Sequence, residues 1–146
     1  MLGTFLRPDA KDIIARAWAD KHVKRHALEV IEQGYTVVRG AIPEKQCEET
    51  IADFRRLEAA NSEIFAANRD AKGHYPRIVS LHSAMPSLVK LFTRNKRWLA
   101  TQDLLFGART ALYTSLFYET GSQQAIHRDS PLFCTRPEYL YFGSTV

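Results

Sequence analysis

His127 and Asp129 are the two residues of this chain whose types and spacing best suit metal binding. Side chains two residues apart on an extended segment point to the same side, so an imidazole nitrogen and a carboxylate oxygen can reach one cation. Such a pair with one further histidine is the ligand set of non-haem iron(II) oxygenases, which leaves coordination positions open for substrate and oxygen. Short spacings also arise by chance, and the alternative interpretation is a loop histidine hydrogen-bonded to a neighbouring carboxylate.

The first two-thirds of the chain has the apolar spacing of helices. Asp9 is a candidate cap for a first helix, and Gly34 is a candidate stop for a second. Pro43 opens the clearest amphipathic helix, which we expect to be the most secure element of the chain. Its apolar stripe comprises Cys47, Ile51, Phe54 and Leu57, and further helix faces are predicted within residues 85–92 and 98–106.

Strand chemistry is concentrated in the last third, where aromatic and β-branched residues gather around a Gly-Ser turn. The final predicted strand is apolar and runs to Val146, so we expect something to continue the sheet beyond it. Strands or extended segments are predicted, in chain order, over residues 35–39, 77–81, 111–118 and 123–127 and from residue 139 onwards.

Two stretches of sequence carry a resemblance to a known family. The first is Gly-Tyr-Thr-Val-Val-Arg-Gly over residues 34–40, followed by the helix at Pro43. The second is Ser-Leu-Phe-Tyr-Glu-Thr-Gly-Ser-Gln-Gln-Ala-Ile-His-Arg-Asp-Ser-Pro-Leu-Phe over residues 115–133. In this element order, over residues 32–146, the chain resembles the phytanoyl-CoA dioxygenase-like family. The resemblance implies an iron(II)- and 2-oxoglutarate-dependent oxygenase built on a double-stranded β-helix.

The expected fold class is α+β, with a helical N-terminal part packed on an incomplete double-stranded β-helix, or jelly-roll, barrel. A complete jelly roll has about eight strands, of which this chain supplies about three. We expect one domain over residues 1–146. It divides into a helical extension (1–33), a helical support with short strands (34–110) and the first barrel strands (111–146).

The resemblance also assigns roles to single residues. His127 and Asp129 match the first two iron ligands of the family, and no residue is predicted to be catalytic. Arg77 falls where the family often places a basic residue that contacts 2-oxoglutarate; the alternative is a solvated loop arginine. Tyr113 and Ser115 alternate along one strand, so they share a face, although core packing is the alternative for Tyr113. The predicted co-substrate positions are Arg77, Tyr113, Ser115, Gln124 and Thr145, with a turn-forming role as the alternative for Gln124.

The chain also departs from the family pattern. The family supplies a distal histidine and a carboxylate-binding arginine from strands well downstream, and this chain ends seventeen residues after Asp129. The remaining histidines, at positions 22, 26, 74 and 82, match no ligand position. We therefore expect this chain to be the front portion of an oxygenase, with little turnover on its own. Whether the chain is itself an enzyme stays open. The competing hypothesis is a non-catalytic protein that associates with itself or with another chain through an exposed strand edge.

Composition limits the partners. Hydrophobic residues make up 45% of the chain and charged residues 25%, which is typical of a globular protein. The net charge of +4 permits anionic partners without requiring them, and the basic runs are too short to predict a nucleic-acid site. No apolar stretch is long enough to predict a membrane span, and two widely separated cysteines suggest a reducing compartment. We expect a cytoplasmic protein that acts on a small organic substrate.

Overall fold

The computed structural model describes residues 3–75, 77–119, 121 and 125, which form two compact units. Within the described residues, unit 1 comprises residues 3–41 and 96–111. Unit 2 comprises residues 42–75, 77–95, 112–119, 121 and 125. Each unit has its own buried apolar cluster, and each is described below by itself.

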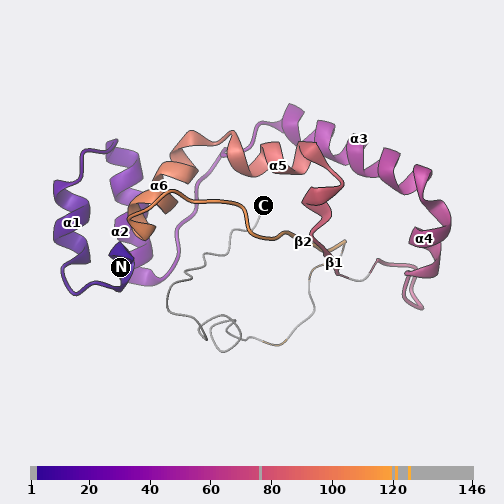
Figure 1. Ribbon diagram of the computed structural model, residues 1–146, viewed down its shortest axis with the longest axis horizontal. Helices are drawn as coiled ribbons and strands as arrows, with labels where there is room; N and C mark the ends of the chain where they lie inside the picture. Colours follow the sequence, from indigo (N-terminus) through magenta and orange to yellow (C-terminus); the bar gives the residue numbers. More distant parts are fainter. Residues whose placement is uncertain (1–2, 76, 120, 122–124, 126–146) are drawn as a thin grey trace. The chain divides into compact units, whose positions relative to one another are not determined.

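Unit 1 is helical. It contains the 3₁₀ helix η1 (Thr4–Leu6) and the helices α1 (Ala10–Arg16), α2 (Lys21–Gln33) and α6 (Lys96–Phe106). Helix α2 packs against both α1 and α6 (Figure 1). Ile14, Ala27 and Leu105 supply one buried side chain from each of these helices, and together they form the core of the unit. Their burial confirms that the helical spacing of the sequence marks an interior face.

The ends of α2 follow from its flanking residues. The Asp20 carboxylate accepts a hydrogen bond of 2.8 Å from the backbone N–H of His22, which satisfies a donor that the helix itself leaves open. Gly34 ends the helix with φ of +85°, a conformation that glycine adopts without steric cost. Asp9 stands at the cap position of α1, but its carboxylate binds the Arg7 guanidinium at 2.9 Å instead of a helix N–H. Asp9 is therefore the N-cap residue, as predicted, but its carboxylate makes no capping hydrogen bond.

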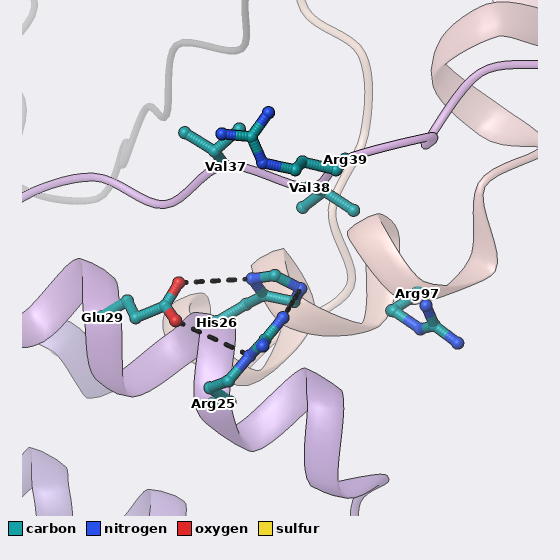
Figure 2. A pocket seen from close by; sticks show the side chains of 7 residues that line it. All are labelled: Arg25, His26, Glu29, Val37, Val38, Arg39 and Arg97. Carbon is teal, nitrogen blue, oxygen red and sulfur yellow. Dashed lines mark hydrogen bonds and ion pairs between the residues drawn. The ribbon is translucent and has the colours of Figure 1, made fainter.

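The strand predicted over residues 35–39 is also wrong. Residues 35–38 have no regular secondary structure and pair with no strand in the described part of the chain. The Thr36 hydroxyl instead donates to the Glu29 carboxylate and accepts a hydrogen bond of 2.7 Å from His26 Nδ1. Side-chain contacts thus hold the segment to α2. The His26 and Glu29 side chains of α2 lie beneath the segment in Figure 2. β-Branched residues favour extended backbone, but a strand requires a partner.

Unit 2 contains most of the remaining elements. Helix α3 (Glu44–Ala60) starts directly after Pro43, as predicted, and α4 (Ser62–Ala67) follows it almost without a break. The helix predicted within residues 85–92 is also confirmed, since these residues largely form α5 (Pro86–Thr93). The helix predicted within residues 98–106 is confirmed as part of α6, which belongs to unit 1. The apolar stripe of α3 is only partly interior, because Ile51 is 60% exposed and Cys47 is exposed.

Aromatic rings form much of the core of unit 2. The Phe54 ring stacks on the Phe117 ring at a centroid distance of 4.7 Å and meets the Phe65 and Tyr75 rings edge-on at 5.8 and 6.1 Å. Leu81 and Met85 are buried in the same cluster. Phe54 is therefore the side chain of α3 that ties the helix to the sheet and to the loop before it.

The sheet of unit 2 is small. Strands β1 (Ile78–Val79) and β2 (Leu116–Phe117) pair antiparallel, with Ile78 opposite Phe117, and the 3₁₀ helix η2 (Leu81–Ser83) follows β1. Only two of the eight residues predicted as a strand over 111–118 are in the ladder. The described residues are consistent with an α+β fold but contain no barrel. The strand predicted over 123–127, apart from residue 125, and the strand predicted from residue 139 lie outside them. None of the helices in the described part has the length and apolarity needed to cross a bilayer.

Candidate functional site

The β1–β2 ladder organises the described part of the predicted site. It brings the segment that follows Arg77 alongside the segment that follows Ser115, although 38 positions separate these two residues in the chain. The backbone N–H of Ser80 donates to the carbonyl oxygen of Ser115 at 2.8 Å, which extends the pairing by one residue beyond the strands. Because the strands are antiparallel, Ser115 lies at the Ser80 end of the ladder and Arg77 at the opposite end, so the ladder does not bring these two residues side by side. Their shared role at a co-substrate stays a prediction.

Ser115 is buried and paired with a histidine. Its hydroxyl oxygen lies 2.9 Å from His82 Nδ1 and accepts a longer hydrogen bond of 3.2 Å from the His82 backbone N–H. The side chain of Ser115 is therefore already engaged at the start of η2. No pattern in the sequence indicated this contact, because His82 matched no ligand position of the family and the register of the ladder is not encoded locally.

Tyr113 and Ser115 do not share one environment. Tyr113 is 67% exposed, whereas Ser115 is only 7% exposed. Alternation along a strand predicts a common face, but both residues precede the short strand β2. The alternative of core packing is wrong for Tyr113, and the role of each residue at a co-substrate stays a prediction.

Arg77 immediately precedes β1 and is exposed. It forms no ion pair with any side chain in the described part of unit 2. Its guanidinium group is therefore accessible to an anionic ligand, and this accessibility also fits the alternative of a solvated arginine.

The predicted metal ligands His127 and Asp129 lie outside the described residues, as do Gln124 and Thr145. Among the residues that are described, no three or more histidine, cysteine, aspartate or glutamate side chains gather closely enough to hold a metal ion. The donor set of His127 and Asp129 fits iron(II) chemically, since it combines a neutral imidazole nitrogen with an anionic carboxylate. These two residues are accordingly the candidates for holding the metal.

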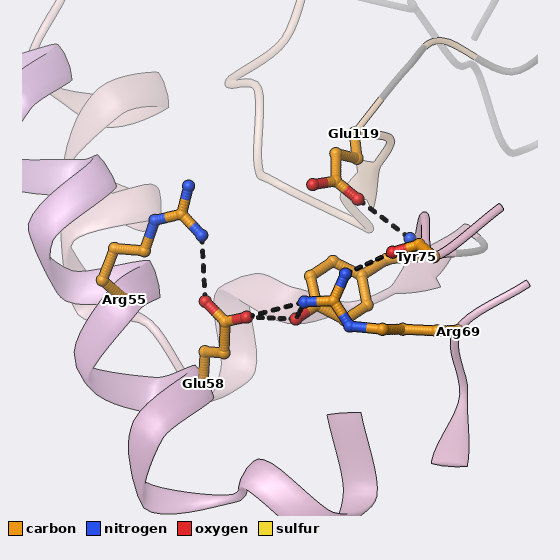
Figure 3. A network of polar contacts seen from close by, with 6 residues as sticks. Arg55, Glu58, Arg69, Tyr75 and Glu119 are labelled. Atoms are coloured by element: carbon orange, nitrogen blue, oxygen red, sulfur yellow. Dashed lines mark hydrogen bonds and ion pairs between the residues drawn. The ribbon is translucent and has the colours of Figure 1, made fainter. Parts of the chain in front are cut away.

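A network of polar side chains surrounds Tyr75, which is 6% exposed. Its hydroxyl group donates to Glu58 Oε1 and accepts from the Arg69 guanidinium, which also lies 4.0 Å from the centre of the tyrosine ring (Figure 3). Arg55 and Arg69 each bind the Glu58 carboxylate at 3.0 Å. Glu58 is thus the shared acceptor through which α3 holds the segment of residues 69–75.

Glu119 connects this network to the end of the ladder. Its carboxylate accepts a hydrogen bond of 2.9 Å from the backbone N–H of Tyr75, across 44 positions of sequence (Figure 3). Glu119 lies two residues after β2 and eight residues before His127. The contact therefore joins the Glu119 side chain to the backbone of Tyr75, and no local pattern in the sequence indicated it.

The Tyr75–Glu58 hydrogen bond changes both pKa values. Burial and the contact with the Glu58 carboxylate raise the pKa of Tyr75, while the Tyr75 hydroxyl and the Arg55 guanidinium lower the pKa of Glu58. A lowered carboxylate pKa adds stability above the ordinary value of 4.5, and that stability is lost as the pH falls through the folded-state pKa. A raised tyrosine pKa adds stability that is lost as the pH rises above 10.0.

Glu58→Gln is therefore expected to flatten the acid limb of the stability profile. Between pH 7 and pH 3 the free energy of unfolding should fall less in this variant than in the unaltered chain. Glutamine does not ionise, so the variant has no carboxylate stabilisation to lose on protonation. Urea unfolding followed by circular dichroism at several pH values measures the difference. Glu63→Gln, which removes an exposed carboxylate on α4, serves as the matched control. Equal acid limbs in Glu58→Gln and the unaltered chain would contradict the assignment.

Comparison with known proteins gives one match. A family model described as phytanoyl-CoA dioxygenase (PhyH) matches residues 30–146, from within α2 to the last residue given. The match covers most of the chain and includes both strands, the Tyr75 network, and His127 and Asp129. It confirms the resemblance seen in the sequence motifs. No curated protein and no solved structure matches the chain.

Proposed function

The chain belongs to the phytanoyl-CoA dioxygenase family, and from this membership we propose that it acts as an iron(II)- and 2-oxoglutarate-dependent oxygenase that hydroxylates a small organic substrate. The family match over residues 30–146 is the observation that carries the proposal, because it includes the His127–Asp129 pair. Membership indicates an oxygenase of this type at the level of the family. The cofactors and the residues that bind them are proposals for this chain.

In the proposed site, His127 and Asp129 hold iron(II) through an imidazole nitrogen and a carboxylate oxygen. Bound iron supplies open coordination positions at which oxygen and 2-oxoglutarate can react. Because only one of the two protein ligands is anionic, iron(II) bound to them would keep a net positive charge that attracts the anionic co-substrate. The chain's own contribution is to hold the metal with these two side chains.

Arg77 is the proposed partner of a 2-oxoglutarate carboxylate. Its exposure and its lack of an ion pair in the described part of unit 2 support this role, because a guanidinium binds a carboxylate through two parallel hydrogen bonds. The remaining proposed co-substrate positions include Ser115, whose hydroxyl would keep accepting from the His82 backbone N–H and would donate its own proton to an oxygen of 2-oxoglutarate. The others are Tyr113, Gln124 and Thr145.

Calorimetry under argon tests the proposal. Iron(II) should bind to the full chain, and 2-oxoglutarate should bind to the iron-loaded chain more tightly than to the metal-free chain. Arg77→Gln should weaken 2-oxoglutarate binding about tenfold while leaving iron(II) affinity unchanged. Arg94→Gln, an exposed arginine of the same unit, is the matched control and should change neither affinity.

The outcomes separate the metal from the co-substrate. Equal 2-oxoglutarate affinity with and without iron(II) would contradict the oxygenase proposal. Iron-dependent binding that Arg77→Gln leaves unchanged would contradict only the role of Arg77.

A second candidate function is association through the sheet. Val79 and Leu116 are opposite each other in the ladder and are 54% and 47% exposed, so they form an apolar pair on the surface of unit 2. Apolar strand surfaces favour pairing with another chain. Sedimentation analysis over a range of protein concentrations tests this candidate, since Leu116→Lys should shift an associating chain towards monomer. A chain that is monomeric at every concentration would exclude self-association.

A further inference from the structure

Unit 1 contains a hollow of about 250 Å³ that the proposed oxygenase site does not use. Arg25 and Glu29 of α2, Arg39 of the segment after α2, and Arg97 of α6 line it together with the apolar side chains of Val37 and Val38 (Figure 2). His26 lies at its base and is 2% exposed. Three arginine residues thus line one small hollow whose lining includes a single carboxylate residue.

On the α2 side, the side chains that line the hollow form, together with Thr36, a series of hydrogen bonds in which each donor and acceptor can be identified. The Thr36 hydroxyl donates to the Glu29 carboxylate, so its oxygen must accept the proton that His26 Nδ1 carries. His26 Nε2 is then an acceptor, and the Arg25 guanidinium donates to it at 3.3 Å. These contacts fix the imidazole and the carboxylate before any ligand arrives.

The charge in the hollow is not balanced. Glu29 Oε1 lies 3.6 Å from Arg25 Nε, and the Thr36 hydroxyl lowers the pKa of the Glu29 carboxyl, so the carboxylate is ionised and already engaged. Neither Arg39 nor Arg97 forms an ion pair in the described part of unit 1, although Arg97 contributes to lowering the pKa of Asp20 from a longer range. Three positive groups against one negative group leave an excess of about two charges.

We propose that this hollow binds the phosphate group of a small molecule. A phosphate group carries a charge of about −1.5 to −2 at neutral pH, which matches the excess. It offers acceptor oxygens in several directions, and guanidinium groups bind such oxygens in pairs. Val37 and Val38 provide an apolar surface for an organic portion of the ligand. The proposal does not rest on the oxygenase function, because none of the residues that line the hollow is proposed to bind iron(II) or 2-oxoglutarate.

Titration calorimetry with the full chain at low salt tests the site, with inorganic phosphate, phenyl phosphate and succinate as probes. Both phosphates should bind, and succinate, a dianion of different shape, should bind at least about tenfold more weakly. Tighter binding of phenyl phosphate would identify an organic phosphate ester as the ligand class. Equal binding of the two phosphates would identify free phosphate, and either result supports the site.

Exposed arginines give matched variants. Arg39→Gln and Arg97→Gln should each weaken phosphate binding about tenfold, and both side chains are exposed, so neither change should disturb the helices. Arg109→Gln removes the same charge from an exposed position of the same unit outside the hollow and should leave the affinity unchanged. Circular dichroism checks that all three variants keep the helical content of the unaltered chain.

Two results would overturn the proposal. One is an equal loss of phosphate affinity in Arg39→Gln, Arg97→Gln and Arg109→Gln, since this would show attraction to net charge alone. The other is binding of succinate as tight as that of phosphate, since the hollow would then select charge and not the phosphate group.

Discussion

His127→Ala is expected to raise the dissociation constant of iron(II) by more than about a hundredfold. Even the loss of a group that only orients a metal ligand costs about ten- to a hundredfold in affinity, and His127 is proposed to bind the metal itself. Asp129→Ala should have an effect at least as large, because it also removes the negative charge that offsets the metal. Anaerobic calorimetry with the full chain measures both changes.

The control for this prediction is His22→Ala. His22 lies in the first turn of α2, and its backbone N–H, which the substitution keeps, makes the contact with Asp20. The substitution therefore removes an imidazole without touching the proposed site. Iron(II) affinity that falls equally in His22→Ala and His127→Ala would show nonspecific imidazole binding. Unchanged affinity in His127→Ala would remove the basis of the proposed metal site.

Phe54→Ala is expected to destabilise unit 2 by about 3–5 kcal/mol, the usual cost of truncating a buried aromatic side chain. The Phe54 ring contacts three other rings at centroid distances of 4.7 to 6.1 Å, so its loss leaves a cavity between α3, the Tyr75 loop and β2. Phe54→Leu should cost less because it retains most of the apolar volume. Hydrogen exchange measured by mass spectrometry should show faster exchange in peptides from α3 and around β1 and β2.

Ile51→Ala is the matched control on the same helix. Ile51 is 60% exposed, and its truncation should cost less than about 1 kcal/mol. Exchange in Phe54→Ala that is no faster than in Ile51→Ala would show that the aromatic cluster does not hold the unit together.

The helices could be predicted from the sequence because their signals are local. Apolar spacing, Pro43 and Gly34 act within a few residues of the structure that they specify, and α2, α3, α5 and α6 appear where they were predicted. Strands depend on a partner that is distant in the chain. The β-branched segment over residues 35–39 finds side-chain partners on α2 instead of a strand, and only two of the residues over 111–118 pair in a ladder.

The same difference between local and long-range signals explains which residues of the candidate site could be predicted from the sequence. The His127–Asp129 pair is a local motif, and the family match agrees with the motif that surrounds it. The contacts of Ser115 with His82 and of Glu119 with Tyr75 depend on the register of the ladder and on the path of the loop before it. The hollow is lined by residues from α2, from the segment after α2 and from α6, so no window of sequence contains it.

The position at which the family match begins has a practical consequence for truncation. The match starts at Val30, inside α2, so a chain trimmed to that boundary would keep only the last four residues of the helix, up to Gln33. It would lose the Asp20 cap and the Ala27 side chain, and four residues are too few to nucleate a helix in water. A shortened protein intended to retain the packing of α6 should therefore begin before Asp20.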